Sequence, residues 1–367
     1  MKPNQFLLAV LLTTGLTACL GTGLNPTAAV PAAASSASGA PVISFSGSPI
    51  SVMNEQYATA IVGQTTSSAN ATGNGATDLN GPIGAVTVSG TTLFVPDTNN
   101  QRIQAFDPIP TGIGPTSSLT VNADGWHLYQ TLTVTAGNTF FGLLSAGDDD
   151  IGLLGWNAPP ATNVAADFHV GTNNGGGGPI DTSPQDVSTA GTKLVVANGG
   201  GNNILIFNTI PTSVNPTPDL ILTQSSSGTL SNPSGVWTNG TVLVVADTGN
   251  NKVLVWNNFP ATDVAPDFAL DTTPGAAMSG PTSVFVTSAG QLFVCDTANN
   301  RVLVWNSMPT ADHTPPNNVL GQSDFNGVGA NEGFTTDIFS LSAPHGVYVS
   351  GGKIFVTDTG NNRILIY

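Results

Sequence analysis

The last ten residues, Asp358-Thr-Gly-Asn-Asn-Arg-Ile-Leu-Ile-Tyr367, contain a motif that recurs along the chain. An Asp is followed by a turn rich in Asn, a basic residue five positions later, and a run of β-branched and aromatic residues. Close copies begin at Asp97, Asp247 and Asp296, and divergent copies at Asn198 and Gly147. Position 247 lies 49 residues from both 198 and 296. A period near 50 residues is typical of a repeat architecture.

Each repeat consists of short strand-like segments. Residues 241–246 are rich in β-branched residues, and residues 252–256 form a further strand-like run. Clusters of Pro, Gly, Asn and Thr separate such segments, as in hairpins. No segment has a sustained helical period. Four strands in about 50 residues are typical of a propeller blade, so six copies predict an all-β fold, a six-bladed β-propeller with four-stranded antiparallel blades.

The N-terminal part of the propeller is predicted to close the ring. The sixth repeat ends at Tyr367 with only three strands, and residues 58–64 resemble residues 317–322, the outer strand after the fifth repeat. We therefore expect residues 58–64 to be the fourth strand of the last blade, which removes an exposed sheet edge.

The repeat resembles a known family. Pro-x-Gly-Val, a Leu-Phe-Val strand and Asp-x-x-Asn-x-Arg-Val together resemble the NHL repeat, which forms β-propellers. The clearest copies are residues 233–256, 281–305 and 344–367, and the pattern covers roughly residues 82–367. This resemblance implies a fold but no single function, because propellers host many functions.

The N-terminus has the pattern of a secretion signal. Lys2 precedes an apolar segment, residues 6–16, which is too short to span a membrane. Leu16-Thr-Ala-Cys19 resembles the lipobox of bacterial lipoproteins, which implies cleavage after residue 18 and lipidation of Cys19. The alternative is an ordinary secretory signal cut nearby. Leu20 after the Cys resembles outer-membrane sorting, which implies an outer-membrane lipoprotein that is periplasmic or surface-exposed.

We expect three regions: a signal peptide (1–18), a lipid attachment site with a flexible Ala/Pro/Ser-rich tether (19–49), and the propeller (50–367). After cleavage, 22 acidic residues face 6 basic ones, a net charge of −16. A surface so poor in basic residues argues against nucleic-acid binding. Cys295, in a predicted core strand, is expected to be a buried thiol.

The charged residues of the motif are predicted to form structural pairs: Asp97 with Arg102, Asp247 with Lys252, Asp296 with Arg301, and Asp358 with Arg363. The divergent third copy has Asn198 and Asn203 instead. Both charges are replaced together, as mutual contact would require, because a lone half-buried charge is costly. The alternative is a ring of Arg side chains that binds an anion.

The residues after the Pro of each repeat are predicted to face the central channel. Aligning the repeats places one residue from each blade there: Ile83, Gln130, Gln185, Ser234, Thr282 and His345. Such a neutral, hydrogen-bonding ring suits a polar uncharged ligand or a peptide loop.

The ring lacks a recognisable metal site. In the peptide-amidating lyase of this family, similar Pro-His positions supply three His to a metal, and here only Pro344-His345-Gly346 fits. The remaining His residues, 127, 169 and 313, fall at other positions of the repeat. Asp148, Asp149 and Asp150 suggest a calcium site as an alternative to a solvated turn, but no calcium-loop pattern accompanies them. We therefore expect no metal or other cofactor.

Two functions stay open. The first is a non-catalytic lipoprotein of the cell envelope that binds a ligand or an envelope protein through one propeller face and contacts the membrane only through its lipid. The alternative is an extracytoplasmic lyase or hydrolase. The missing metal-binding trio favours the first.

Overall fold

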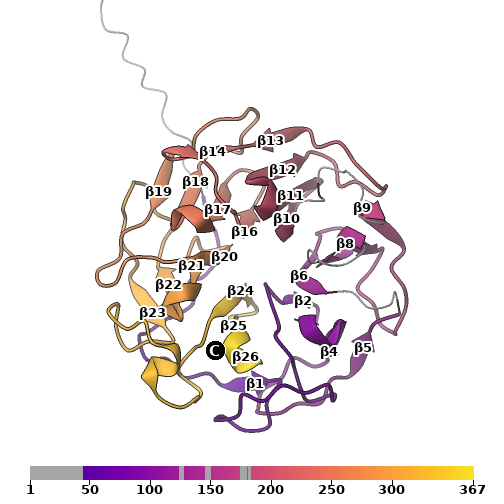
Figure 1. Cartoon of the computed structure of the whole chain (residues 1–367), viewed down its shortest axis with the longest axis vertical. Coiled ribbons are helices and arrows are strands. Elements are labelled where there is room, and N and C mark those ends of the chain that lie inside the picture. Colours follow the sequence, from indigo (N-terminus) through magenta and orange to yellow (C-terminus); the bar gives the residue numbers. More distant parts are fainter. Residues whose placement is uncertain (1–43, 124–127, 145–149, 174–179, 181–182) are drawn as a thin grey trace, which may run out of the picture. The chain divides into compact units, whose positions relative to one another are not determined.

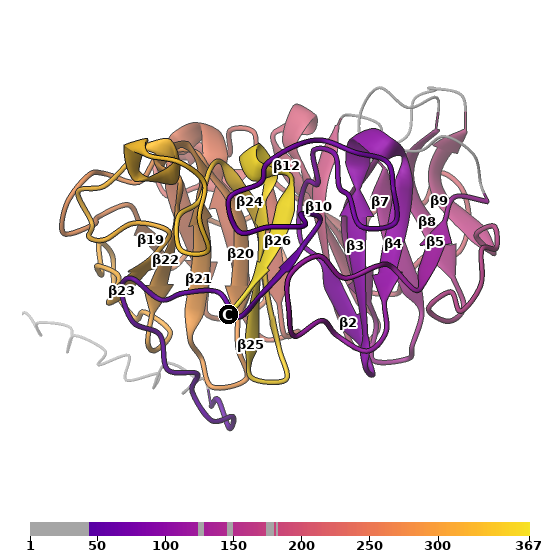
Figure 2. The ribbon, with the colours of Figure 1, turned by 90° about the horizontal axis from the view of Figure 1, so that it is seen from below.

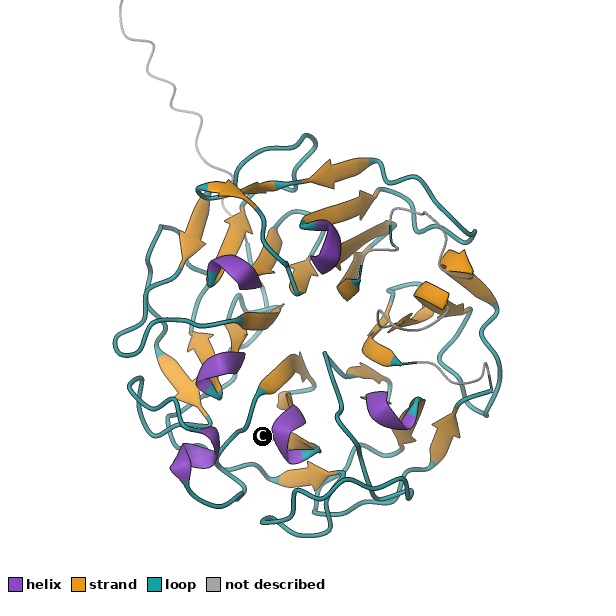
Figure 3. Ribbon diagram, viewed as in Figure 1, coloured by secondary structure: helices purple, strands orange, loops and turns teal. Residues whose placement is uncertain are grey.

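The computed structural model describes residues 44–123, 128–144, 150–173, 180 and 183–367. In this part, six four-stranded antiparallel sheets surround a central axis (Figure 1). The prediction of an all-β, six-bladed β-propeller is confirmed. The helical residues described form short 3-10 turns between strands (Figure 3). None of the helices in the described ranges has the length and apolar character needed to cross a membrane.

The blades follow the chain in order, and each runs from an inner to an outer strand. Blade 1 contains β2 (Thr87–Ser89), β3 (Thr92–Asp97), β4 (Arg102–Phe106) and β5 (Leu119–Val121). Blade 2 contains β6 (Tyr129–Val134), β7 (Phe140–Leu144), β8 (Asp150–Trp156) and β9 (Phe168–Asn173). Blade 3 contains β10 (Pro184–Ala190), β11 (Lys193–Asn198), β12 (Asn203–Phe207) and β13 (Leu220–Leu222).

Blade 4 contains β16 (Gly235–Thr238), β17 (Leu243–Asp247), β18 (Lys252–Trp256) and β19 (Phe268–Leu270). Blade 5 contains β20 (Pro281–Val286), β21 (Leu292–Asp296), β22 (Arg301–Trp305) and β23 (Asn318–Leu320). Blade 6 contains β24 (Pro344–Ser350), β25 (Lys353–Asp358), β26 (Arg363–Ile366) and β1 (Ala60–Val62). A small hairpin, β14 (Gln224–Ser225) and β15 (Gly228–Thr229), precedes blade 4.

The two ends of the propeller meet in blade 6. Strand β1 pairs antiparallel with β26, and Ala60 lies opposite Ile366. The prediction that residues 58–64 supply the fourth strand of this blade is confirmed. The chain before β1 also contacts blade 5, since Gly47 N donates to Ser288 O at 2.8 Å and Val319 N donates to Asn54 Oδ1 at 2.9 Å (Figure 2). Contact with the blades therefore begins before residue 50.

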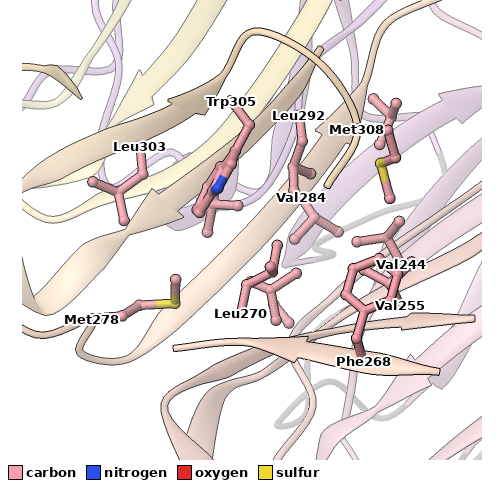
Figure 4. Close-up of a cluster of buried hydrophobic side chains, with 14 of the residues drawn as sticks. Val244, Val255, Phe268, Leu270, Met278, Val284, Leu292, Leu303, Trp305 and Met308 are labelled. Atoms are coloured by element: carbon pink, nitrogen blue, oxygen red, sulfur yellow. The ribbon is translucent and has the colours of Figure 1, made fainter. Parts of the chain in front are cut away.

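The hydrophobic core is divided among the interfaces between blades. Buried side chains in the described residues form six clusters, each between two neighbouring blades. Strand β21 contributes Leu292 and Val294 to the cluster shared with blade 4, which Figure 4 shows with Leu292 labelled. The same strand contributes Phe293 and Cys295 to the cluster shared with blade 6. Successive strand residues point to opposite faces, so burial of both faces explains why these strands are apolar throughout.

The motif forms the turn between the second and third strands of a blade. After the Asp, or after Asn198 in blade 3, the chain makes one 3-10 turn and then a left-handed residue with φ between 52° and 55°, at Gln101, Asn202, Asn251, Asn300 and Asn362. Asn tolerates this conformation better than most residues. The inner strand of a blade starts beside this turn. In blade 6, for example, Pro344 at the start of β24 lies opposite Asp358 at the end of β25. We call the side of the propeller that carries these turns the motif face (Figure 2).

Candidate functional site

The motif pairs are largely structural. In three blades the guanidinium Nε of the Arg donates to the Asp Oδ2, at 2.6 Å for Arg102–Asp97 and at 2.7 Å for Arg301–Asp296 and Arg363–Asp358. The predicted fourth pair requires correction. Lys252 Nζ lies 3.9 Å from Asp271, whereas Asp247 Oδ2 accepts a hydrogen bond of 2.6 Å from Ser225 Oγ. The hairpin that carries Ser225 thus supplies the hydrogen bond that an Arg supplies elsewhere.

The remaining Arg donors hold loops on the motif face. Arg301 donates to the carbonyl oxygens of Phe325 at 2.6 Å and Ala276 at 2.7 Å, and its side chain is fully buried. Arg363 likewise donates to Ser340 O. Because these donors are used within the protein, the geometry does not favour the alternative of a ring of Arg that binds an anion.

The Thr of the motif joins neighbouring blades. The hydroxyls of Thr98, Thr248, Thr297 and Thr359 donate at 2.6 to 2.7 Å to carbonyl oxygens at the start of the next inner strand: Tyr129, Pro281, Pro344 and Pro82. This role was not predicted from the sequence, although four of the six repeats have an Asp-Thr pair at this position. These bonds help to position the inner strands, and with them the residues around the axis.

An axial cavity of about 180 Å³ lies where the inner strands begin. Five of the six residues predicted to face the channel line it: Ile83, Gln185, Ser234, Thr282 and His345. The sixth, Gln130, is buried and is not among the lining residues. The geometry therefore gathers most of the predicted ring around one space, with Asn232 and Thr248 beside it.

The position after each ring residue decides how closely the blades approach. Blades 1, 4 and 6 have Gly84, Gly235 and Gly346 there, and a Cβ on any of them would collide with backbone of the next blade. Blades 2, 3 and 5 instead have Thr131, Asp186 and Ser283. Polar side chains at this position reach neighbouring inner strands, as Ser283 Oγ does by accepting a hydrogen bond from Val347 N at 3.2 Å.

Asp186 is a lining residue that the sequence analysis missed. It is 8% exposed, and it borders both the axial cavity and a smaller chamber of about 60 Å³ deeper along the axis. Its Oδ2 accepts from Val236 N and its Oδ1 from Val187 N, both at 2.9 Å. Burial raises the pKa of Asp186 to about 7, against the opposing effect of these N–H donors and of the Thr131 hydroxyl. The only sequence signal was an acid where other repeats have Gly, Thr or Ser.

His345 supplies the imidazole of the cavity. Burial lowers the pKa of His345 below 6.5, so the ring is neutral at physiological pH. The adjacent ring residue, Thr282, donates to His345 O at 3.1 Å and lies 2.5 Å from Thr297 Oγ1. The axial cavity therefore combines hydroxyl and amide groups with one imidazole and one carboxyl group.

Larger hollows lie away from the axis. One of about 500 Å³ lies between blades 1 and 2 and includes Phe94, Asp107 and Pro160, and one of about 330 Å³ lies at the matching place between blades 3 and 4. Because equivalent elements line both, we attribute them to the spacing of repeated blades and favour the axial cavity, where chemically distinct residues from several blades converge.

The structure gives little information on the other sites predicted from the sequence. Cys19, Asp148 and Asp149 lie outside the described residues, and Asp150 belongs to β8. No group of three His, Cys, Asp or Glu side chains suited to a metal occurs in the described ranges. Cys295 is buried, and burial raises the pKa of its thiol, which keeps it protonated and unreactive.

Comparison with known proteins supports the fold. A family model described as NHL repeat matches residues 341–367, which include β24, β25 and β26. No match is found among curated proteins.

Solved structures with a similar fold include two lyases. One is virginiamycin B lyase from Staphylococcus aureus, with 12% identity, coverage of 79% of this chain and 96% of that chain, and a TM-score of 0.43. The other is a streptogramin B lyase, with 15% identity, coverage of 81% and 95%, and a TM-score of 0.43. A luciferin-regenerating enzyme has 14% identity, coverage of 78% and 91%, and a TM-score of 0.47. Similarity at this level concerns the fold and carries no argument about activity.

Proposed function

We propose that this protein is a non-catalytic binding protein that uses the motif face of its propeller, with a small polar ligand or a peptide loop entering the axial cavity. The observation that carries the proposal is the convergence of Gln185, Ser234, Thr282 and His345 on one space of about 180 Å³. Hydroxyl, amide and imidazole groups on a rigid β scaffold fix a polar ligand through directional hydrogen bonds.

We place this binding protein in the bacterial cell envelope. The support is the sequence pattern Leu16-Thr-Ala-Cys19, which resembles a lipobox. Acylation of Cys19 would tether the propeller to a membrane, by inference the outer membrane, through the lipid alone. Mass spectrometry of the N-terminal peptide from cells tests this, with Cys19→Ala as the control. An unmodified peptide that still contains residues 1–18 would contradict it.

A lyase or hydrolase is the second candidate, because Asp186 and His345 border the same cavity. A carboxyl group with a raised pKa and a neutral imidazole are the groups that general acid–base catalysis uses. Binding is favoured over catalysis because the ring has one His, at Pro344-His345-Gly346, whereas the peptide-amidating lyase of the family that the repeat resembles has three His at similar positions. Turnover of a bound molecule that is lost in His345→Gln would reverse this preference.

The main experiment is a binding screen directed at the cavity. Small polar molecules and short peptides are tested by ligand-observed NMR against the full-length chain and a Gln185→Ala/His345→Ala double variant. We expect binders to lose at least tenfold in affinity in the double variant and to keep their affinity in Asn208→Ala, which alters the hollow between blades 3 and 4. Binders that are indifferent to the double variant would refute the axial site.

A further inference from the structure

Asp186 and Asp247 are the two buried acidic residues in the described part of the propeller that have no cationic partner. Asp247 accepts hydrogen bonds from Ser225, Ser231 and Asn250, whereas Asp186 borders the axial cavity. The six Lys and Arg residues of the described part are Arg102, Lys193, Lys252, Arg301, Lys353 and Arg363, and no ion pair joins any of them to Asp186. A buried carboxylate normally has a counter-charge, because burial removes the water that would otherwise stabilise its charge.

The fold itself does not require a carboxyl group at this position. Ser283 occupies the matching place in blade 5, and its hydroxyl accepts from Val347 N of blade 6 just as Asp186 accepts from Val236 N of blade 4. A Ser thus makes the same bond between blades without a charge. The carboxyl group of Asp186 is therefore surplus to the structure, and a surplus buried carboxyl group beside a cavity points to a ligand.

We propose that Asp186 anchors the ligand of the axial cavity and that this ligand carries a protonated amine. The inference rests on the proposed function and specifies its ligand class. Each oxygen of Asp186 accepts one backbone N–H, and the Thr131 hydroxyl also bonds to this carboxyl group. A carboxylate has about four lone-pair sites, so acceptor capacity is left for a ligand in the cavity that Asp186 borders. An ammonium group supplies the missing positive charge and donates to these oxygens.

The rest of the cavity matches the polar remainder of such a molecule. Ser234 and Thr282 offer hydroxyls and Gln185 an amide, and the space of about 180 Å³ equals roughly six water molecules at ~30 Å³ each. A compact amino alcohol or amino sugar fits this size. The sequence predicted an uncharged ligand because the predicted ring did not include Asp186. Since Asp186 also lines the cavity, we now propose a ligand with a positive charge.

Matched pairs of probes test the inference on the full-length chain. Ethanolamine is compared with ethylene glycol, and glucosamine with glucose, by titration of the His345 ring protons in NMR spectra. We expect each amine to bind at least tenfold more tightly than its neutral partner. Asp186→Asn and Asp186→Ser should reduce this preference to less than threefold. Asp186→Ser copies blade 5 and keeps the bond between blades, so it separates loss of charge from loss of folding.

Glu55→Gln is the control for charge, because it removes an exposed carboxylate outside the cavity, and it should keep the amine preference. Equal binding of amine and neutral partner overturns the amine inference while leaving the axial site in place, since His345 still reports binding. Absence of any His345 response to these probes and to every binder from the screen overturns the proposed site itself. A response to CaCl2 at lower concentration than to either amine also overturns the inference, in favour of a metal ligand.

Discussion

Blades 3 and 5 share one fold but differ at the motif turn. In blade 5, Asp296 and Arg301 form a buried ion pair, and Arg301 also holds two loop carbonyls. In blade 3, Asn198 Nδ2 donates to Asn203 Oδ1 at 3.0 Å across the same turn. A neutral amide pair therefore closes the turn as well, so the ion pair of blade 5 is not required for the blade to form. Its additional role is to hold the loops around the motif face.

In the inner strands of the same two blades, it is blade 3 that has the ionisable side chain and blade 5 that has the neutral one. Blade 5 has Ser283 and blade 3 has Asp186, and each accepts a backbone N–H of the next blade. Blade 3 thus lacks the ion pair that blades 1, 5 and 6 use for structure, and it has a carboxyl group where the other repeats have Gly, Thr or Ser. A charge that departs from the repeat in this way is the better candidate for function.

The largest expected effect comes from breaking the ion pair of blade 5 on one side. Asp296→Asn leaves Arg301 buried without its partner and should lower the free energy of unfolding by ~3–5 kcal/mol. Urea denaturation measures this. The double variant Asp296→Asn/Arg301→Asn copies blade 3, and we expect it to lose less than the two single variants together, with a coupling of ~1–3 kcal/mol. Strict additivity would show that the pair is not a unit.

The second effect is a pH dependence that belongs to blade 3. The folded-state pKa of Asp186, about 7, lies above its unfolded value, so the folded protein holds this proton between about pH 4 and 7 while the unfolded chain loses it. The wild type should therefore lose stability relative to Asp186→Ser as pH rises through this window, by roughly 2–4 kcal/mol between pH 4 and pH 8. Urea curves at several pH values measure the difference. Parallel pH profiles for the two proteins would contradict it.

A third experiment tests the bond that joins blade 5 to blade 6. Thr297→Val removes the hydroxyl that donates to Pro344 O at 2.6 Å and should cost ~1–3 kcal/mol, because the carbonyl loses a buried partner. Blade 3 has Gly199 at this position, where a Cβ would press on Asn232 and Gln185. Gly199→Thr should consequently destabilise the protein instead of adding a bond. Stabilisation by Gly199→Thr would contradict this expectation, because it would mean that Asn232 and Gln185 move aside at little cost.

The smallest effect is expected in blade 4, where Lys252, the basic residue of the motif, does not form an ion pair with Asp247. Lys252→Ala removes only the 3.9 Å contact with Asp271 and the bond to Ser226, and should change stability by less than ~1 kcal/mol. Thermal denaturation of this variant beside Arg301→Ala in blade 5 makes the comparison direct. A loss for Lys252→Ala as large as that for Arg301→Ala would mean that Lys252 also carries a structural role.

Sequence periodicity determined the six blades, the strand content and the closure by residues 58–64, because every blade repeats the same local rules of strand, turn and register. It also located most of the axial ring, since Ile83, Gln185, Ser234, Thr282 and His345 hold equivalent positions in the repeat. Only the tertiary structure revealed that Ser225 replaces a basic residue at Asp247, that the motif Thr joins neighbouring blades, and that Asp186 is buried beside the ring. These contacts join residues from different blades, whereas a repeat pattern describes each blade by itself. Whether a side chain is buried, and whether a group of opposite charge lies beside it, depends on the residues of the neighbouring blade. Only the packing of the blades against one another brings these residues together.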